Sequence, residues 1–327
     1  MKFGVPGSGE PAYPPPDGGL VRRAREWRVQ VDPARLRERV EALPGPRNRS
    51  HAPEAMRAAD ELLIGAWRVA GWRTGRQRVP PDGSNLVAIR EGASREAIVV
   101  VAHHDTVPGS PGADDNGAAL AALLELAQHL GRERQPRTVI LAAPDYEEIG
   151  LLGSRHLVRW LRSAFDVRAA IVFDPIGFMD PAPNTQRVPA GIDVLYPGQV
   201  ARLDARQRAG DTVVAIYRRR SIDLVREWAR CLAATMDPDR ILLLRDPVDL
   251  PLVGPMLLAL PAARNFSRSD HLRFWQAGLP AIQVTNTANF RNPNYHRASD
   301  TPDTLDYATL ANITAATGLT VERLAAG

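Results

Sequence analysis

Residues 97–116 read Ala-Ile-Val-Val-Val-Ala-His-His-Asp-Thr-Val-Pro-Gly-Ser-Pro-Gly-Ala-Asp-Asp-Asn, and this stretch decides how the rest of the chain is interpreted. Its first six residues form an apolar run long enough for one buried strand, which ends in two histidines and a carboxylate. A loop of Gly, Pro and Ser leads to two more carboxylates and then to an alanine- and leucine-rich helical pattern. In open α/β sheets, ligands bind outside the carboxyl ends of the strands. The stretch therefore predicts a buried strand that ends in metal-binding side chains.

The composition is that of an ordinary globular protein. The chain has 327 residues, of which 44% are hydrophobic and 24% charged, and this length supports one large domain or two small ones. The formal net charge is only +4, and the densest basic cluster is the triplet Arg218–Arg220, so nucleic-acid binding is not expected. Cys231 is the single cysteine, which excludes an internal disulfide framework and a zinc site built from cysteines.

The sequence also bears on location and partners. No apolar run approaches about 18 residues, so neither a transmembrane helix nor a membrane partner is expected. The residues after Met1 lack the hydrophobic region of a signal peptide, which makes a cytoplasmic location the default expectation. The sequence leaves the oligomeric state open.

Apolar runs and helical periods alternate along the chain. Ala97–Ala102, Thr138–Ala143 and Ala169–Phe173 are typical of buried strands, and helical patterns separate them. This rhythm predicts an α/β fold with a largely parallel core sheet. We also expect a helical stretch over Val21–Leu43, and no regular period over Asp237–Arg264.

Two domain-level expectations follow. Residues 1–20 are rich in Pro and Gly and are expected to form a loose tail or an arm over the body. Residues 21–327 are expected to form a single domain. Within it, residues 179–211 and 237–268 are irregular, and long excursions of this kind are often functional.

Acidic and imidazole side chains gather where the predicted strands end. In chain order they are His103, Asp105, Asp114, Asp115, Glu147, Glu148 and Asp174, with His296 in a late polar loop. Carboxylates that converge at one sheet edge repel one another, and one or two divalent cations are the simplest way to stabilise them. A carboxylate and imidazole set without thiolate favours Zn²⁺.

Strand geometry suggests roles for some of these residues. Alternate residues of a strand point the same way, so His103 and Asp105 share a side while His104 points away. Asp105 can then orient the imidazole of His103, as carboxylates commonly do for metal-bound histidines. Of the adjacent Glu147 and Glu148, we expect one to bind metal and the other to take a proton from metal-bound water.

The chain resembles the M28 family of zinc peptidases, the dinuclear aminopeptidases and their relatives. The resemblance runs in the family's order from about Asn85 to the carboxyl terminus. The matching pieces are His103-His104-Asp105, Gly112–Asn116, Glu147–Ser154, Phe173-Asp174, Ser269-Asp270-His271, Tyr295-His296 and Ser299-Asp300-Thr301. It implies a zinc exopeptidase-like three-layer sandwich, in which helices flank a central mixed, largely parallel sheet.

The resemblance also implies a role for each matching residue. Two zinc ions per chain are expected, and the implied ligands are His103, Asp115, Glu148, Asp174 and His296. Asp115 resembles the bridging carboxylate, Glu147 the general base and Asp105 the residue that orients His103. Tyr295 is expected to steady the tetrahedral intermediate, and Asp270 to cap a helix or to line the substrate pocket. Pro175, directly after Asp174, departs from the family's usual pattern but leaves the ligand in place.

The implied activity is that of an aminopeptidase. A metal-bridging hydroxide would attack the first peptide bond of a peptide or amino-acid derivative, with Glu147 moving the proton. Residues 179–211 and 237–268 are expected to shape the substrate pocket, and the side-chain preference is not legible in the sequence.

Several alternatives stay open. A glutaminyl-cyclase-like acyltransferase shares this fold but works with one zinc, whereas the full ligand set favours two. A carboxypeptidase or dipeptidase of the same family would use the same ligands. Non-catalytic modules of the transferrin-receptor kind tend to lose ligands, and none is missing here. The M20 peptidases share a His-x-Asp and a Glu-Glu pair, but Gly112–Asn116 fits them poorly and they carry a separate dimerisation domain.

Overall fold

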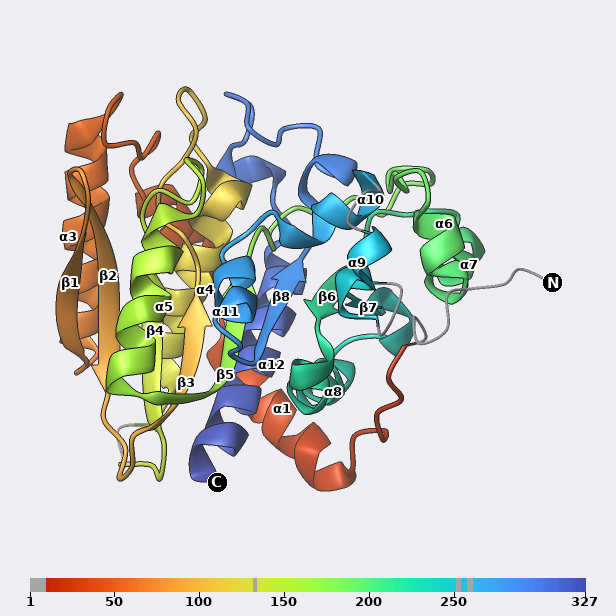
Figure 1. Ribbon diagram of the computed structural model, residues 1–327, viewed down its shortest axis with the longest axis horizontal. Helices are drawn as coiled ribbons and strands as arrows, with labels where there is room; N and C mark the ends of the chain where they lie inside the picture. Colours follow the sequence, from red (N-terminus) through yellow and green to blue (C-terminus); the bar gives the residue numbers. More distant parts are fainter. Residues whose placement is uncertain (1–9, 132–133, 251–253, 258–260) are drawn as a thin grey trace.

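The central sheet has eight strands among the residues that the computed structural model describes, which are 10–131, 134–250, 254–257 and 261–327 (Figure 1). Its strand order is β1-β2-β4-β3-β5-β8-β6-β7. The strands are β1 (Arg73–Val79), β2 (Gly83–Arg90), β3 (Glu96–Val101), β4 (Thr138–Ala143), β5 (Asp166–Phe173), β6 (Val213–Tyr217), β7 (Ile241–Arg245) and β8 (Ala281–Thr285).

Parallel pairing dominates the middle of this sheet. Strands β4, β3, β5 and β8 run parallel to one another, whereas β2 pairs antiparallel with both β1 and β4. Strand β6 is antiparallel to β8 and parallel to β7. Because β3, β4 and β5 are parallel, their carboxyl ends meet at one edge, and the residues that follow them converge there.

Helices cover both faces of the sheet (Figure 1). They are α1 (Gly18–Gln30), α2 (Pro33–Ala42), α3 (Pro53–Val69), α4 (Ala119–His129), α5 (Leu152–Ala164), α6 (Ile192–Leu195), α7 (Pro197–Ala205), α8 (Ile222–Ala233), α9 (Gly254–Leu257), α10 (Pro261–Arg264), α11 (His271–Gln276) and α12 (Tyr307–Ala326). A π-helical turn, η1 (Ala113–Ala118), precedes α4. Single 3₁₀ turns lie at Arg219–Ser221, Pro238–Arg240, Pro247–Asp249, Asn265–Ser267, Ala288–Phe290 and Pro302–Thr304.

The alternation of strand side chains divides the core into two layers. On β3, Ile98 and Val100 pack into a cluster with α1, α4, α8 and α12, whereas Val99 and Val101 pack with α5 and α11 on the other face. Every residue from Ala97 to Val101 is buried, as expected of a strand covered on both faces. The predicted α/β sandwich with a mixed central sheet is confirmed.

The amino-terminal helical stretch is two helices, not the single one expected over Val21–Leu43. Helix α1 ends at Gln30 and α2 begins at Pro33. Pro33 lacks an N–H and occupies the first turn of α2, where none is needed, while the Asp32 carboxylate accepts from Ala34 N at 2.9 Å. This Asp-Pro pair starts a new helix and so breaks the longer one.

Parts of the expected tail and of the second excursion lie outside the described residues, namely 1–9, 251–253 and 258–260. Ahead of α1, the Glu10 carboxylate accepts from Leu243 N of β7 at 2.7 Å. None of the described helices combines the length and apolarity that crossing a membrane requires.

Candidate active site

All five predicted ligands meet at the carboxyl edge of the sheet, together with Glu147. The candidate ligand atoms form two groups there, and within each group all the atoms lie within 4.8 Å of one another. The first group is His103, Glu147 and Asp174, and the second is Asp115, Glu148 and His296. His103, Glu147 and Asp174 follow β3, β4 and β5, Asp115 lies in η1, and His296 belongs to the loop before α12.

The Asp115 carboxylate lies between two imidazoles. Its Oδ1 is 3.2 Å from His103 Nε2, and its Oδ2 is 3.0 Å from His296 Nε2. Asp174 Oδ1 lies 3.8 Å from the first imidazole, and Glu148 Oε2 lies 3.2 Å from the second. The Asp115 carboxylate thus faces His103 with one oxygen and His296 with the other, and a further carboxylate lies near each imidazole, Asp174 near His103 and Glu148 near His296.

Several ligand atoms in this cluster lack hydrogen-bond partners among the described residues. They are His103 Nε2, Asp115 Oδ1 and Glu148 Oε1, all buried. A buried polar atom without a partner is costly unless something else satisfies it. These atoms belong to the two groups of candidate ligands and are of the types that coordinate zinc, so the residues present fit this metal.

Backbone contacts fix the direction of the His103 ring. His103 Nδ1 lies 3.1 Å from the carbonyl oxygen of Asp105, to which it donates when protonated, and 3.6 Å from the Asp105 carboxylate. That carboxylate accepts instead from Glu147 N at 3.1 Å and from Glu148 N at 3.2 Å. Asp105 therefore orients the histidine mainly through its main chain, and its side chain holds the glutamate pair.

Two further carboxylates hold the Asp115 segment in place. Asp300 accepts from Asp114 N at 2.9 Å and from Asp115 N at 3.2 Å. Asp114 turns away from the ligands and accepts from Gly177 N and Asn286 Nδ2 at 2.8 and 3.0 Å. Both residues are fully buried, so the position of the Asp115 segment is fixed from two sides.

A buried arginine ties the same loop to the amino-terminal segment. Arg47 donates to the carbonyl oxygens of His104, Pro111 and Gly112, at 3.0, 3.0 and 2.9 Å. Burial lowers the pKa of Arg47 to about 10, against the opposing effect of nearby carboxylates, chiefly Asp300. The guanidinium therefore stays charged at neutral pH and offsets part of the negative charge of the cluster.

Burial and mutual charge shift the titration of the cluster. Burial raises the pKa of Glu147 well above its ordinary value, and the neighbouring Asp174 raises it further. Burial also raises the pKa of Glu148, to about 7. For His296, contacts with Asp115 and Glu148 outweigh burial and raise the pKa to about 10. Groups shifted in this way are typical of functional sites.

The loop between β8 and α12 carries Tyr295 and His296 and contributes both side chains to the site. The two rings stack, with centroids 3.9 Å apart at an angle of 17°. His296 has a φ of +62°, in the left-handed region that non-glycine residues seldom adopt. Such strained positions are common where a side chain must be aimed for function.

Asp270 is the N-cap residue of α11, but its side chain caps no N–H group. The carboxylate is fully buried, and burial raises its pKa to about 7. Its negative charge helps to raise the pKa of Glu147. Asp270 is not among the described residues that line the pocket beside the cluster.

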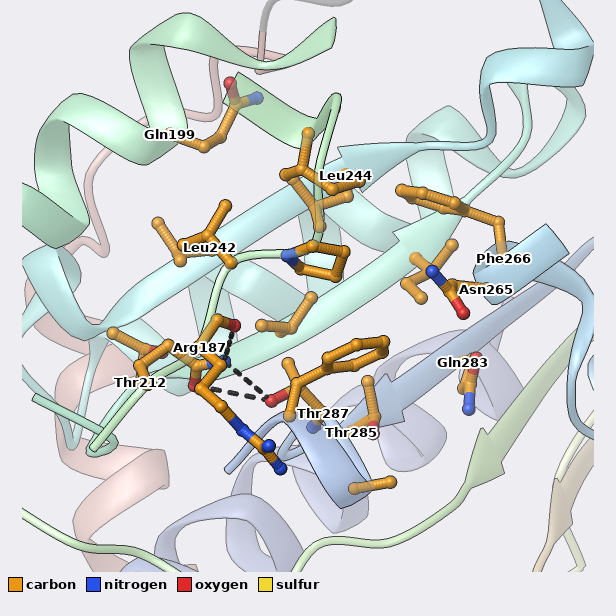
Figure 2. Close-up of a pocket in the computed structure, with 18 of the residues that line it drawn as sticks. Arg187, Gln199, Thr212, Leu242, Leu244, Asn265, Phe266, Gln283, Thr285 and Thr287 are labelled. Atoms are coloured by element: carbon orange, nitrogen blue, oxygen red, sulfur yellow. Dashed lines mark hydrogen bonds between the residues drawn. The ribbon is translucent and has the colours of Figure 1, made fainter. Parts of the chain in front are cut away.

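An apolar pocket opens beside the cluster. Asp174 belongs to the cluster and Tyr295 stacks on His296, and both residues also line the pocket. Figure 2 shows Leu242, Leu244 and Phe266 around the same space, with Gln199 at the far side. The lining includes many residues of 179–211 and 237–268, the two excursions expected to shape a substrate pocket.

Comparison with known proteins decides the family. The model of peptidase family M28 matches residues 85–214 and 256–321, which include every residue of the cluster. The chain belongs to peptidase family M28. This membership confirms the predicted family and the predicted enzyme class, a metallo-exopeptidase.

Relatives of this M28 peptidase have been found among curated proteins and solved structures. The uncharacterised protein YfbL of Escherichia coli is 29% identical over 82% of the chain and 80% of its own length. The probable lipoprotein aminopeptidase LpqL of Mycobacterium tuberculosis is 29% identical over 73% of the chain and 46% of its own length. The crystal structure of LapB from Legionella pneumophila shares the fold, with a TM-score of 0.70 at 19% identity over 98% of the chain and 78% of that structure.

Sequence reasoning left other residues of this M28 peptidase without a role. His104, expected to point away from the ligands, contacts Asp60 Oδ1 through Nε2 at 3.0 Å. Arg49 bridges Asp60 and Asp145, with separations of 3.0 and 2.7 Å. The Asn48-Arg49-Ser50 segment carries no strand or helix signal, so only the three-dimensional contacts reveal that it underlies the site.

Proposed function

We propose that this chain is a zinc-dependent aminopeptidase that holds two metal ions and hydrolyses the first peptide bond of its substrate. His103 and Asp174 would hold one ion, His296 and Glu148 the other, and Asp115 would bridge them. The observation that carries the proposal is the placement of the Asp115 carboxylate, whose two oxygens face two different histidines at 3.2 and 3.0 Å. The name of the aminopeptidase relative LpqL supports the choice of reaction.

The chain's own residues can perform the proton transfers of amide hydrolysis. When bound, zinc polarises the scissile carbonyl and lowers the pKa of the attacking water. Glu147 is buried beside His103 and Asp174 and can take a proton from that water and deliver it to the leaving amine nitrogen. Asp105 holds the backbone of Glu147 in place, and Tyr295 can donate to the carbonyl oxygen as negative charge develops on it.

Metal analysis and turnover together test the proposal. Protein purified in metal-free buffer and reloaded with Zn²⁺ should bind about two ions per chain and release the chromophore from aminoacyl p-nitroanilides. Asp115→Asn should lower the zinc content and remove most activity, because both sets of ligands depend on this carboxylate. Asp223→Asn, at a side chain that is 94% exposed, is the control and should change neither quantity.

Two further assays on the same zinc-loaded preparation separate the alternatives. One tightly bound ion together with cyclisation of a glutaminyl peptide would favour the glutaminyl-cyclase-like activity. Release of the carboxyl-terminal residue from a blocked peptide would favour a carboxypeptidase. The cytoplasmic location remains a prediction.

A further inference from the structure

An open groove runs between α5 and α11, which pack against each other over one face of the sheet (Figure 1). Its volume is about 500 Å³, and it shares no described lining residue with the apolar pocket. Four of the eight described residues that line it are arginines, and none is a carboxylate. The arginines are Arg155, Arg159 and Arg162 of α5 and Arg273 of α11. This α5–α11 groove therefore concentrates positive charge at a place distinct from the metal-ligand cluster.

The three arginines of α5 have no partner for their charge in the described structure. Their guanidinium groups make no hydrogen bond or ion pair with any described residue, and all three residues are exposed. Arg155 and Arg159 are four positions apart on the helix, and Arg159 and Arg162 are three apart. Like charges at these spacings repel each other and destabilise a helix. An anionic ligand in the groove would relieve this repulsion when it binds.

Elsewhere in the chain, two arginines at the same spacing are neutralised. Arg35 and Arg39 of α2 lie four positions apart, and both pair with the buried carboxylate of Glu125, at 2.7 and 2.5 Å. The arginines of α5 have no such carboxylate among the described residues that line the groove. Their charge is thus left available for a partner that is not part of this chain.

The fourth arginine links the groove to the turn that follows Glu147 and Glu148. Arg273 donates through Nε to Leu151 O at 3.3 Å and through Nη2 to Gly150 O at 2.8 Å. Gly150 N and Leu151 N in turn donate to Glu147 O, at 3.1 and 2.9 Å. A ligand in the groove would therefore lie beside the segment that carries the proposed general base.

The spacing of the α5 arginines matches that of side chains on an extended peptide. A helix rises about 1.5 Å per residue, so Arg159 follows Arg155 by about 6 Å along the axis, and Arg162 follows Arg155 by about 10 Å. Alternate residues of an extended chain are about 6.6 Å apart and point to the same side. Carboxylates at every second position of such a peptide can therefore pair with successive arginines, and each guanidinium can hold one carboxylate with two hydrogen bonds.

The surface between the arginines favours a peptide over a simple chain of phosphates. Val158 of α5 and Ala277 at the end of α11 add apolar surface to the lining. A peptide can place side-chain methylene groups against this surface, whereas a chain of phosphates has no apolar atoms to bury there. Peptides are also the substrates expected of a chain that belongs to a peptidase family.

We propose that the α5–α11 groove binds an acidic peptide segment, whose carboxylates pair with Arg155, Arg159 and Arg162. The attraction is electrostatic and acts between exposed groups, so salt weakens it. The proposal goes beyond the aminopeptidase function and does not depend on it, because the groove shares no described residue with the metal-ligand cluster. Positive charge beside the Glu147 turn also raises the local concentration of acidic peptides at this edge of the protein.

A blocked peptide measures this binding without serving as a substrate. A peptide of four Glu-Ala repeats, acetylated at its amino terminus and labelled with fluorescein at the other end, offers no free amine to an aminopeptidase. In fluorescence anisotropy titrations with the zinc-loaded protein in low-salt buffer, it should bind at least about tenfold more tightly than the matching Gln-Ala peptide. Its affinity should fall about tenfold when the salt is raised to about 0.15 M. Equal affinity for the two peptides would overturn the proposal.

Charge-reversal variants test whether the peptide binds in the groove. Arg159→Glu should weaken binding of the Glu-Ala peptide about tenfold, because one ion pair is lost and a repulsion is gained. The double variant Arg159→Glu with Arg162→Glu should not bind this peptide and should instead bind the Lys-Ala peptide. These side chains are exposed, so the variants should fold, which circular dichroism checks.

Arg57→Glu is the matched control, since it changes the net charge equally at an exposed arginine of α3, outside the groove. It should keep the affinity for the Glu-Ala peptide within about twofold of wild type, as expected for a charge that makes no contact with the ligand. An equal loss of affinity in Arg57→Glu and Arg159→Glu would show that net charge alone governs binding, and the proposal would fail.

Two comparisons separate this proposal from its rivals. Tripolyphosphate that displaces the labelled peptide at a lower concentration than the unlabelled peptide does would make the groove a phosphate site and overturn the proposal. Wild-type protein that binds the blocked peptide but hydrolyses no aminoacyl p-nitroanilide would support the groove and contradict the aminopeptidase function. Hydrolysis without peptide binding would do the reverse.

Discussion

The metal-ligand cluster and the roof of the apolar pocket, which is the segment from Gln186 to Leu203, lie side by side but are held in different ways. The cluster is fixed by the ends of parallel strands and by dedicated acceptors such as Asp105 and Asp300. The roof contacts the sheet largely through apolar side chains and a few hydrogen bonds. Such a division lets the chemistry stay constant while the specificity changes, because roof residues can be exchanged without moving a ligand.

The largest expected effect concerns the cluster as a whole. Removing metal with a chelator should abolish amide hydrolysis, and Zn²⁺ should restore it. The buried carboxylates hold the metal ion on which the proposed reaction depends, and no other described group supplies its positive charge. The circular dichroism of the sheet should change little, since the β-strands are held by their own core. Activity that survives exhaustive dialysis against chelator would contradict a metal-dependent cluster.

Glu147→Gln tests the chemical step within the cluster. We expect kcat to fall by about 10²- to 10⁴-fold with little change in zinc content, since general-base catalysis contributes about that much and Glu147 is not a proposed ligand. Steady-state kinetics and metal analysis on the same preparation measure both effects. Loss of zinc in parallel with activity would instead make Glu147 a ligand.

The stability that Glu125 of α4 contributes to the fold should depend on pH. Burial alone would raise the pKa of Glu125 on α4, but hydrogen bonds from His129, Arg35 and Arg39 lower it to about 2. A lowered carboxylate pKa contributes stability that is present above the unfolded value of 4.5 and is lost as the pH falls toward 2. The contribution is about 3 kcal/mol at neutral pH.

Urea unfolding of wild type and Glu125→Gln measures this contribution. The difference in the free energy of unfolding should be largest near pH 6 and should shrink toward zero between pH 4.5 and 2. A difference that does not depend on pH would assign the stability of Glu125 to packing.

Asp300→Asn probes the support of Asp115, the proposed bridging carboxylate. The amide can no longer accept from both Asp114 N and Asp115 N as a carboxylate does. We expect zinc affinity and kcat/KM to fall by about 10- to 100-fold, as is usual when a residue that supports a metal ligand is changed. Competition with a zinc-binding dye measures the affinity, and wild-type affinity would show that Asp115 needs no such support.

The smallest effect is expected at the roof. Ile192→Ala removes apolar contact area from α6 and should lower kcat/KM for the phenylalanine anilide about fivefold, with no change for the alanine anilide. Zinc content should stay at the wild-type value. A loss that is equal for both substrates would mean that the roof also supports the ligands, and the contrast between the two regions would fail.

Part of the cluster could be predicted from apolar runs alone, whereas Asp115 and His296 were assigned from the resemblance to the M28 family. His103, Glu147 and Asp174 each come at the end of a run that periodicity identifies as a buried strand. Strand β7, Ile241–Arg245, was not predicted, since its short run lies among prolines and acidic residues. Strand β1, Arg73–Val79, is a polar edge strand with no apolar period.

The residues that support the cluster, such as Arg47 and Asp300, are harder to predict from the sequence than the ligands. Arg47 gives no periodic or motif signal, because its role rests on contacts with carbonyl oxygens far along the chain. Asp300 lies in a matched motif, yet only the structure shows that it accepts from Asp114 N and Asp115 N. Long-range pairing of this kind depends on the folded topology, which local sequence patterns do not encode.

The order in which the ligands occur along the chain matters while the protein is being made. His103, Asp115, Glu148 and Asp174 are translated first, whereas His296 and the supporting Asp300 follow more than 120 residues after Asp174. A growing chain that already contains β3, β4 and β5 still lacks the second imidazole that faces Asp115. A chain that stops before His296 therefore cannot complete the proposed two-ion cluster.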